Sequence, residues 1–213
     1  MSLEIIERPL EDPKISRCLF RILERNRLCA IATVTPRGEA HINTAYFAYT
    51  PDLEFYFYSY PDTRHALNLM TNRSMAIAIF DSDQSWGRPD RGLQLFGNGR
   101  VAVGQSARDA ERTYDRRFPG HAYWKLPLSA AEGALAPKLF RFRPRTVKLF
   151  DERAFGAGVF VRATVPSRAR APERIPRASS PFASRRARVP AEPKTTGPAP
   201  PHFRTRRDPV SRS

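Results

Sequence analysis

Cysteine is scarce in this sequence, with two residues, Cys18 and Cys29, among 213. Neither belongs to a Cys-x-x-C pair, and neither has a histidine at metal-ligand spacing. This pattern favours two reduced, buried side chains that pack as small apolar groups over a disulfide framework or a zinc site. The sequence also lacks a run of about 18 apolar residues and a basic leader followed by an apolar stretch. We therefore expect a soluble, cytoplasmic protein without a membrane partner.

Acidic residues are in the minority, with 21 Asp and Glu against 36 Lys and Arg, a formal net charge of +15. Residues 166–213 carry +9 of that charge and ten of the 20 prolines, without apolar periodicity. Such a composition cannot bury enough apolar surface to offset the entropy of ordering, so we predict a disordered tail. The remaining +6 is weak support for a nucleic-acid-binding domain. A functionally silent tail is favoured over one that binds nucleic acid or acidic lipid non-specifically.

Short apolar segments separated by turn residues dominate residues 28–150. Before them, residues 13–26 have apolar residues at helical spacing, which predicts a packing helix. The turn chemistry of Pro36-Arg37-Gly38 predicts a hairpin that joins two strands. Glycines at 97 and 99 are typical of a bulge or barrel corner. We predict strands over 28–35, 39–49, 54–60, 74–81, 92–103 and 138–150, and further helices over 63–72 and 106–118, the latter with Ser106 as N-cap.

The aromatic strand that ends at Tyr58-Ser59 runs through a Pro-Asp turn straight into a helix. Thr63, Arg64 and His65 then occupy the first helical turn, where unpaired backbone N–H groups and the helix dipole favour an anion. A hydroxyl, a guanidinium and an imidazole at this place predict a phosphate pocket, with an ordinary capped helix as the alternative. The apolar residues of the helix predict that its buried face holds Ala66, Leu67 and Met70.

The return strand of the first hairpin has polar residues on both faces, because side chains alternate along a strand. His41 and Asn43 point one way, and Thr44 and Tyr46 the other. One face could line a cavity, but we favour His41 and Asn43 facing water near an edge. The loop 82–91 contains Trp86 and either covers a ligand or forms an exposed tip.

Three runs carry a family resemblance: residues 40–47, the strand–turn–helix with Tyr58-Ser59 and Thr63-Arg64-His65, and residues 91–97. Together they resemble the FMN-binding split-barrel proteins related to pyridoxamine 5′-phosphate oxidase, over residues 13–150. With the element pattern, we expect a mainly β (α+β) fold, a six-stranded antiparallel split β-barrel with flanking helices and a disordered C-terminal tail. The domains expected are a flavin-binding barrel over 1–150, a C-terminal extension over 151–165 and the tail over 166–213.

The resemblance implies where FMN would be held. Thr63, Arg64 and His65 occupy the phosphate-binding triplet, with histidine in place of the usual lysine, and Asn43 stands where an arginine is expected. The ring would lie against the hairpin near Thr44, Ala45 and Tyr46. The resemblance also implies a homodimer with the flavin at the subunit interface. The residues expected to bind the cofactor are Asn43, Thr44, Tyr46, Tyr58, Ser59, Thr63, Arg64 and His65, with Gln94 as a polar contact and Trp86 as a cover.

Two departures from the family pattern argue against oxidation of pyridoxamine phosphate. Ala48 stands where a substrate-binding lysine is expected, and no Tyr-x-x-x-Arg-x-x-x-Ser arrangement is evident around Tyr114 to Arg117. We therefore expect an FMN-dependent oxidoreductase acting on another small molecule, with catalytic residues unassigned, because the flavin itself carries the redox chemistry. The alternatives are a deazaflavin protein, a haem protein with His41, His65 or His121 as iron ligand, and a non-catalytic flavin-binding stress module.

Overall fold

The structure is a computed structural model that describes residues 3–120 and 136–166. The chain divides into two units, residues 1–169 and 170–213, and all described residues belong to the first unit. His121 and, apart from Pro166, the tail predicted to be disordered lie outside the described residues. Within the described ranges no helix is long and apolar enough to cross a membrane.

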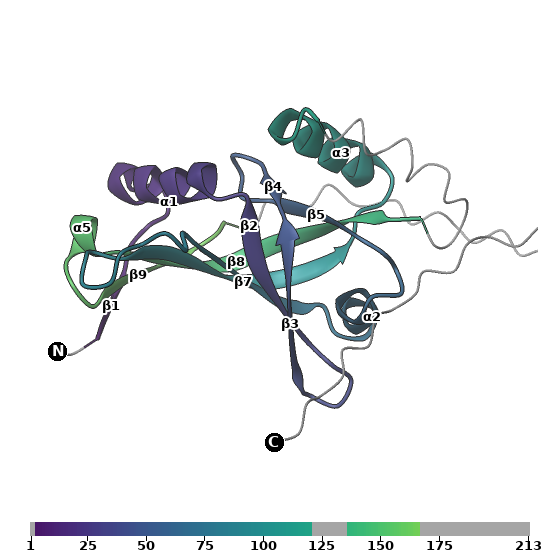
Figure 1. The fold of residues 1–213 in the computed structure, drawn as a ribbon, viewed down its shortest axis with the longest axis horizontal. Helices are drawn as coiled ribbons and strands as arrows, with labels where there is room; N and C mark the ends of the chain where they lie inside the picture. Colours follow the sequence, from purple (N-terminus) through teal and green to yellow (C-terminus); the bar gives the residue numbers. More distant parts are fainter. Residues whose placement is uncertain (1–2, 121–135, 167–213) are drawn as a thin grey trace, which may run out of the picture. The chain divides into compact units, whose positions relative to one another are not determined.

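Nine strands of the described residues form one sheet, in the order β1-β9-β8-β7-β6-β2-β3, with β5 pairing with both β4 and β8 (Figure 1). All neighbours are antiparallel except β1 and β9. The expected fold class is confirmed. The sheet has more than six strands because β1 and β9 join it and because the strand predicted over 39–49 is divided at Phe47 into β3 and β4. The strands are β1 Glu4–Glu7, β2 Leu28–Val34, β3 Ala40–Tyr46, β4 Ala48–Tyr49, β5 Phe55–Ser59, β6 Ser74–Phe80, β7 Arg91–Val101, β8 Lys138–Asp151 and β9 Val159–Thr164.

Strand β8 has 14 residues and pairs with two different strands along one edge. Its first part pairs with β5 and its second with β9, while β7 pairs along its other edge. The register between β7 and β8 shifts at Phe96/Gly97, opposite Pro144. A Cβ on Gly97 would overlap the carbonyl oxygen of Arg143, so glycine is needed at this crossing. Pro144 has no N–H to donate, which suits a residue at a break in the ladder.

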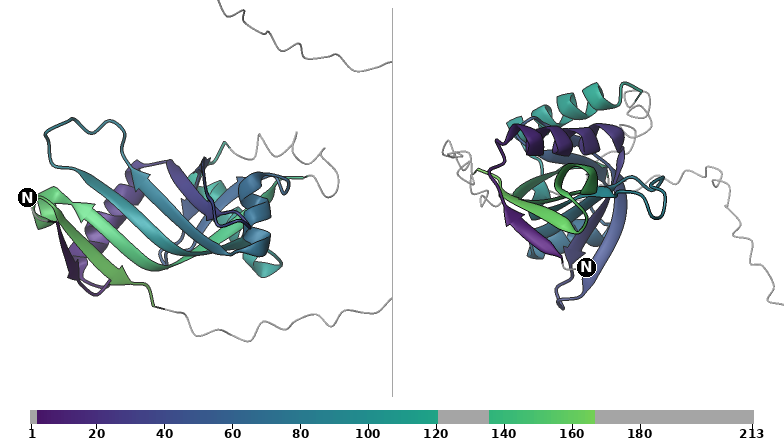
Figure 2. Two further views of the ribbon diagram at one scale, coloured as in Figure 1. Left: turned by 90° about the horizontal axis from the view of Figure 1, so that it is seen from below. Right: turned by 90° about the vertical axis from the view of Figure 1, so that its left-hand side faces the viewer.

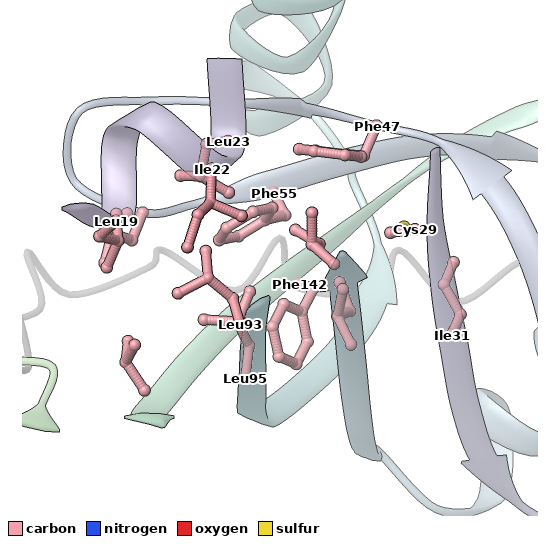
Figure 3. Close-up of a cluster of buried hydrophobic side chains, with 14 of the residues drawn as sticks. Leu19, Ile22, Leu23, Cys29, Ile31, Phe47, Phe55, Leu93, Leu95 and Phe142 are labelled. Carbon is pink, nitrogen blue, oxygen red and sulfur yellow. The ribbon is translucent and has the colours of Figure 1, made fainter. Parts of the chain in front are cut away.

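Helix α1, Pro13–Arg25, covers the main core as predicted. The Asp12 side chain caps it by accepting from the N–H of Lys14 at 2.8 Å, and proline at the first helical position fits a helix start. Figure 3 shows Leu19, Ile22 and Leu23 pointing toward aromatic and leucine side chains of the sheet. Each fully buried leucine or isoleucine contributes about 1.5–3 kcal/mol to folding.

The two cysteines lie in this core as free thiols, which confirms the expected apolar packing. Burial raises the pKa of Cys29 to about 12, so its thiol stays protonated and unreactive at neutral pH.

Helix α3, Gln105–Arg117, covers a smaller cluster against β4, β5 and β8. It begins after Gly104, whose φ of 57° lies in the left-handed region, and not at Ser106 as predicted. Glycine reaches this φ without steric cost, so the chain can turn sharply into the helix. The short helix α5, Glu152–Phe155, follows β8 and is capped by the side chain of Asp151.

Helix α2, Arg64–Thr71, packs against β2, β3 and β7. Figure 1 shows it apart from α1 and α3, which lie at the top of the view. Its predicted buried face is wrong in two of three residues. Leu67 and Met70 are exposed by 46% and 77%, whereas His65 and Asn68 are buried beside Ala66 and Leu69. The helix turns polar side chains inward because those side chains find hydrogen-bond partners there.

Candidate functional site

A cluster of two hydroxyls and an imidazole joins the end of β5 to the start of α2. Ser59 Oγ lies 2.6 Å from His65 Nε2 and 3.0 Å from Thr63 Oγ1. The turn between them is closed by the N–H of Thr63, which donates to the carbonyl of Tyr60 at 3.3 Å. The structure therefore brings together three of the residues predicted to bind the cofactor.

The imidazole of this cluster, His65, is 7% exposed. Its ring packs against Phe57 and Phe140, with centroids 6.2 and 6.4 Å away. On another side it stacks on His41, with the rings 6.4 Å apart and 10° from parallel. Burial, and then the charge that His41 can carry, lower the pKa of His65 below its usual 6.5. His65 is therefore neutral at pH 7.

The first turn of α2 lacks a side-chain cap. Thr63 occupies the N-cap position with φ −68° and ψ 149°, yet its side chain makes no capping hydrogen bond. Its hydroxyl donates instead to the carbonyl of Tyr60 at 2.8 Å. The first helical bond runs from the N–H of Leu67 to the carbonyl of Thr63. The N–H groups of Arg64, His65 and Ala66 therefore have no acceptor among the described residues, which is the arrangement that binds an anion.

Two cationic side chains lie near this helix start. Arg64 is exposed and forms no ion pair with another described residue. Lys138 is exposed and stands directly opposite Ser59 in the pairing of β5 with β8. The sequence did not point to Lys138, because 79 positions separate it from Ser59 and only the strand register brings them together.

A polar seam lies behind the cluster, between α2, β2 and β3. Asn68, which is 1% exposed, donates through Nδ2 to Thr33 Oγ1 at 3.0 Å, and Thr33 is the cross-strand neighbour of His41. Asn43 points to the same side, and its Oδ1 is buried with no partner among the described residues. The interpretation that His41 and Asn43 face water is wrong. This face of β3 points inward, because the alternate side chains of Ile42, Thr44 and Tyr46 are the exposed ones.

Three of the residues expected near the flavin ring, Thr44, Tyr46 and Gln94, lie on the opposite, outer face of the sheet, whereas Ala45 points inward and packs against the core. Thr44 and Gln94 are exposed and belong to one cross-strand row, with Ala30 and Ala78 between them. Tyr46 is exposed on the same face of β3. In one chain these residues do not join the cluster of Ser59, Thr63 and His65.

Tyr58 and Trp86 also lie away from that cluster. Tyr58 is on the other face of β5 from Ser59 and packs edge-on against Tyr114 of α3, with centroids 5.0 Å apart. Trp86 is fully exposed in the loop between β6 and β7. Figure 2 shows this loop and α2 at opposite ends of β6, a strand of seven residues that spans about 20 Å. Within one chain Trp86 therefore lies far from the start of α2.

Nothing in the described parts of the chain groups three or more His, Cys, Asp or Glu side chains as a metal site would require. The Nε2 atom of His65 is hydrogen-bonded to Ser59. The arrangement is instead suited to an anion with several oxygen atoms, because it combines unpaired N–H groups, hydroxyls and a guanidinium.

Residues 19–151 match the family model described as pyridoxamine 5′-phosphate oxidase. That match spans more than half of the chain, and the chain therefore belongs to the pyridoxamine 5′-phosphate oxidase family. A comparison with curated proteins finds no match in sequence.

Solved structures share the fold. A protein of unknown function from Agrobacterium tumefaciens is 22% identical, with TM-score 0.53, over 67% of this chain and 59% of that one. A haem-binding protein from Mycobacterium smegmatis is 16% identical, with TM-score 0.55, over 67% and 55%. A protein from Clostridium acetobutylicum related to general stress protein 26 is 11% identical, with TM-score 0.52, over 69% and 92%. The match thus spans under two thirds of the first two proteins, and likeness at these identities concerns the fold alone.

Proposed function

We propose that this chain binds FMN with the phosphate at the start of α2, and that it works as a flavin-dependent oxidoreductase on a small molecule. The observation that carries the proposal is the uncapped first turn of α2, where three N–H groups have no acceptor among the described residues. These groups lie beside two hydroxyls and the exposed guanidinium of Arg64. Family membership supports a flavin in general, and the donors in this chain support its phosphate in particular.

The donors fit a phosphate in both charge and geometry. Backbone N–H groups at a helix start and the positive end of the helix dipole favour a dianion. Arg64 adds a charge-assisted contact, and Lys138 stands opposite Ser59 on the neighbouring strand. The absence of an arginine at position 43 removes one cation, and Lys138 offers a replacement from another strand.

The ring of the flavin has no complete site in one chain, since Thr44, Tyr46 and Gln94 lie on the outer face of the sheet. We infer that a second copy completes it. That face has a centre of small side chains, Ala30, Ala32, Ala76 and Ala78, bordered by exposed Ile42 and Phe96. Small residues between larger apolar ones suit close sheet-to-sheet packing, which supports a homodimer.

Bound flavin supplies hydride or electron transfer, and the chain contributes binding and orientation. Pyridoxamine phosphate remains excluded from the proposal. Ala48 is fully buried beneath α3, so its position faces no substrate. Arg117 donates to the carbonyls of Leu23 and Asn26, so it supports α1 and does not present a phosphate site.

An absorption spectrum of the purified protein, with mass analysis of any molecule released by heat, tests the proposal. The two-band visible spectrum of oxidised flavin and released FMN would support it. A Soret-type band would favour haem, and a released deazaflavin would favour that cofactor. A colourless protein that takes up no added FMN would overturn the proposal.

Arg64→Ala tests the phosphate site itself. We expect FMN affinity to fall about tenfold, because a charge-assisted contact to phosphate is lost, while riboflavin affinity stays unchanged. Fluorescence titration with both flavins measures this. Arg73→Ala, an exposed arginine just beyond the other end of α2, is the matched control and should retain wild-type affinity. Equal FMN affinity in Arg64→Ala and wild type would contradict the site assignment.

A further inference from the structure

The hydroxyl–imidazole cluster at the start of α2 has three contacts of 3.0 Å or less, but Ser59 and Thr63 supply only two hydroxyl protons. The contacts join Thr63 Oγ1 to the Tyr60 carbonyl at 2.8 Å, Ser59 Oγ to Thr63 Oγ1 at 3.0 Å, and Ser59 Oγ to His65 Nε2 at 2.6 Å. Ser59 Oγ also has a longer contact of 3.4 Å to the Tyr60 carbonyl oxygen. A carbonyl can only accept, so the Thr63 hydroxyl proton goes to Tyr60. Thr63 Oγ1 then accepts from Ser59.

That assignment fixes the state of the imidazole. With the Ser59 proton directed to Thr63, the contact at 2.6 Å is satisfied only if His65 carries its proton on Nε2 and donates it to Ser59 Oγ. In the other tautomer the Ser59 proton goes to Nε2 and the Ser59–Thr63 contact at 3.0 Å holds no proton. The Nε2–H form therefore makes one hydrogen bond more.

We propose that His65 is a positioning residue, in its Nε2–H tautomer, for the two hydroxyls that bind the phosphate of the ligand. Its Nε2–H lies 2.6 Å from Ser59 Oγ and 3.3 Å from Thr63 Oγ1, so it reaches both oxygens from the buried side. With a donor behind them, the two hydroxyls can give up their bonds to the Tyr60 carbonyl and to each other and turn their protons toward a bound anion. The inference rests on the proposed function and assigns a role to this chain's histidine where the family pattern has lysine.

The surroundings of His65 favour a neutral donor over a second cation. Phe57 and Phe140 enclose the ring, and His41 from β3 stacks on it, so a charge on one imidazole opposes a charge on the other. From β8, Lys138 stands opposite Ser59, and exposed Arg64 and Asp62 flank the turn. The cations of this site are thus at its rim, and the imidazole supplies a fixed N–H from inside.

The tautomer is measurable in the flavin-free protein. A long-range ¹H–¹⁵N correlation spectrum distinguishes the two neutral forms of each imidazole by their nitrogen shifts. The sequence has four histidines, and comparison with His65→Gln assigns the signal of His65. We expect the Nε2–H form near pH 7.5, and a neutral Nδ1–H form would overturn the inference.

The role is tested by FMN titration of variants, with riboflavin as the probe that lacks phosphate. His65→Leu removes the donor, and we expect about tenfold weaker FMN binding with riboflavin binding unchanged. His65→Gln keeps an N–H donor and should stay within about threefold of wild type. In a Ser59→Ala/Thr63→Val background, His65→Leu should cost less than about threefold, because its effect passes through the two hydroxyls.

The outcomes separate the inference from the proposed function. Wild-type protein that prefers FMN to riboflavin, with the same preference in His65→Leu, would overturn the inference alone. Independent, multiplying losses in the double-mutant cycle would also overturn it. Wild-type protein that binds FMN no better than riboflavin would overturn the proposed phosphate site, whatever tautomer His65 adopts.

Discussion

At the residue scale, His65 couples the candidate site to pH. The imidazole is buried against aromatic rings and faces His41, and these surroundings lower its pKa below 6.5. The folded chain therefore favours neutral His65, whereas the unfolded chain takes up a proton as soon as the pH falls to about 6.5. A histidine whose pKa is lowered by folding therefore makes the free energy of unfolding smaller as the pH falls.

His65→Gln should flatten the acid side of the stability curve of the flavin-free protein. His65 contributes its full stability above about pH 6.5, and this is lost as the pH falls from there through the lowered pKa of the folded state. Glutamine cannot titrate, so the difference in free energy of unfolding between the two proteins should change over that window. Urea unfolding at a series of pH values measures it, and a difference independent of pH would contradict the prediction.

At the element scale, one side chain ties α3 to the end of α1. The guanidinium of Arg117 donates to the carbonyls of Leu23 and Asn26, both at 2.6 Å. It also lies over the rings of Phe47 and Tyr49, at 4.8 and 4.6 Å. Carbonyls at a helix end lack partners and carry partial negative charge, so a cation here satisfies and stabilises them. Burial lowers the pKa of Arg117, and the group stays charged at neutral pH because the ordinary pKa of arginine lies far above 7.

Arg117→Lys should lower the free energy of unfolding by about 1–3 kcal/mol, because an ammonium cannot reproduce two fixed N–H directions and the ring stacking. Urea unfolding measures the loss. Arg116→Lys changes an exposed neighbour on the same helix and should stay within about 0.5 kcal/mol of wild type. Equal stability of the two variants would show that the carbonyl contacts of Arg117 contribute nothing.

Helix α2 shows why the buried face of an element is hard to read from its sequence. Leu67 and Met70 are apolar and exposed, while His65 and Asn68 are polar and buried. Their partners, Ser59 and Thr33, lie on β5 and β2, and Thr33 is distant in the sequence. Apolar periodicity therefore predicts this helix but not its rotation.

At the scale of the whole molecule, the outer face of the sheet exposes apolar and small side chains that a second copy could cover. Exposed Ile42 and Phe96 border the alanines of β2 and β6, and Thr44 and Gln94 lie in the next row. If a second copy covers this face, it also supplies ring contacts that one chain lacks.

Ala78→Arg should convert the proposed homodimer to a monomer, because it places a long charged side chain at the centre of the alanine surface. Light scattering after size-exclusion chromatography measures the mass. Val103→Glu, at an exposed apolar position before α3, should leave the mass of a dimer unchanged. A monomeric wild-type protein, or a variant that remains a dimer, would contradict the interface.

The amino-acid sequence by itself determined the features that depend on neighbours along the chain. The apolar period of α1, the hairpin of β2 and β3, and the strand–turn–helix at Ser59 to His65 follow from spacing and turn chemistry within a few residues. The cluster of Ser59, Thr63 and His65 follows from the same local pattern, since the three residues are six positions apart at most.

Only the tertiary structure decided the features that depend on strand register and packing. Register placed Lys138 opposite Ser59, and it put Thr44 and Gln94 in one row on the outer face. Packing stacked His41 on His65 and left Trp86 at the far end of β6 from α2. A shift of one residue in strand pairing reverses every side chain, and local sequence carries no information about which distant strand supplies the partner.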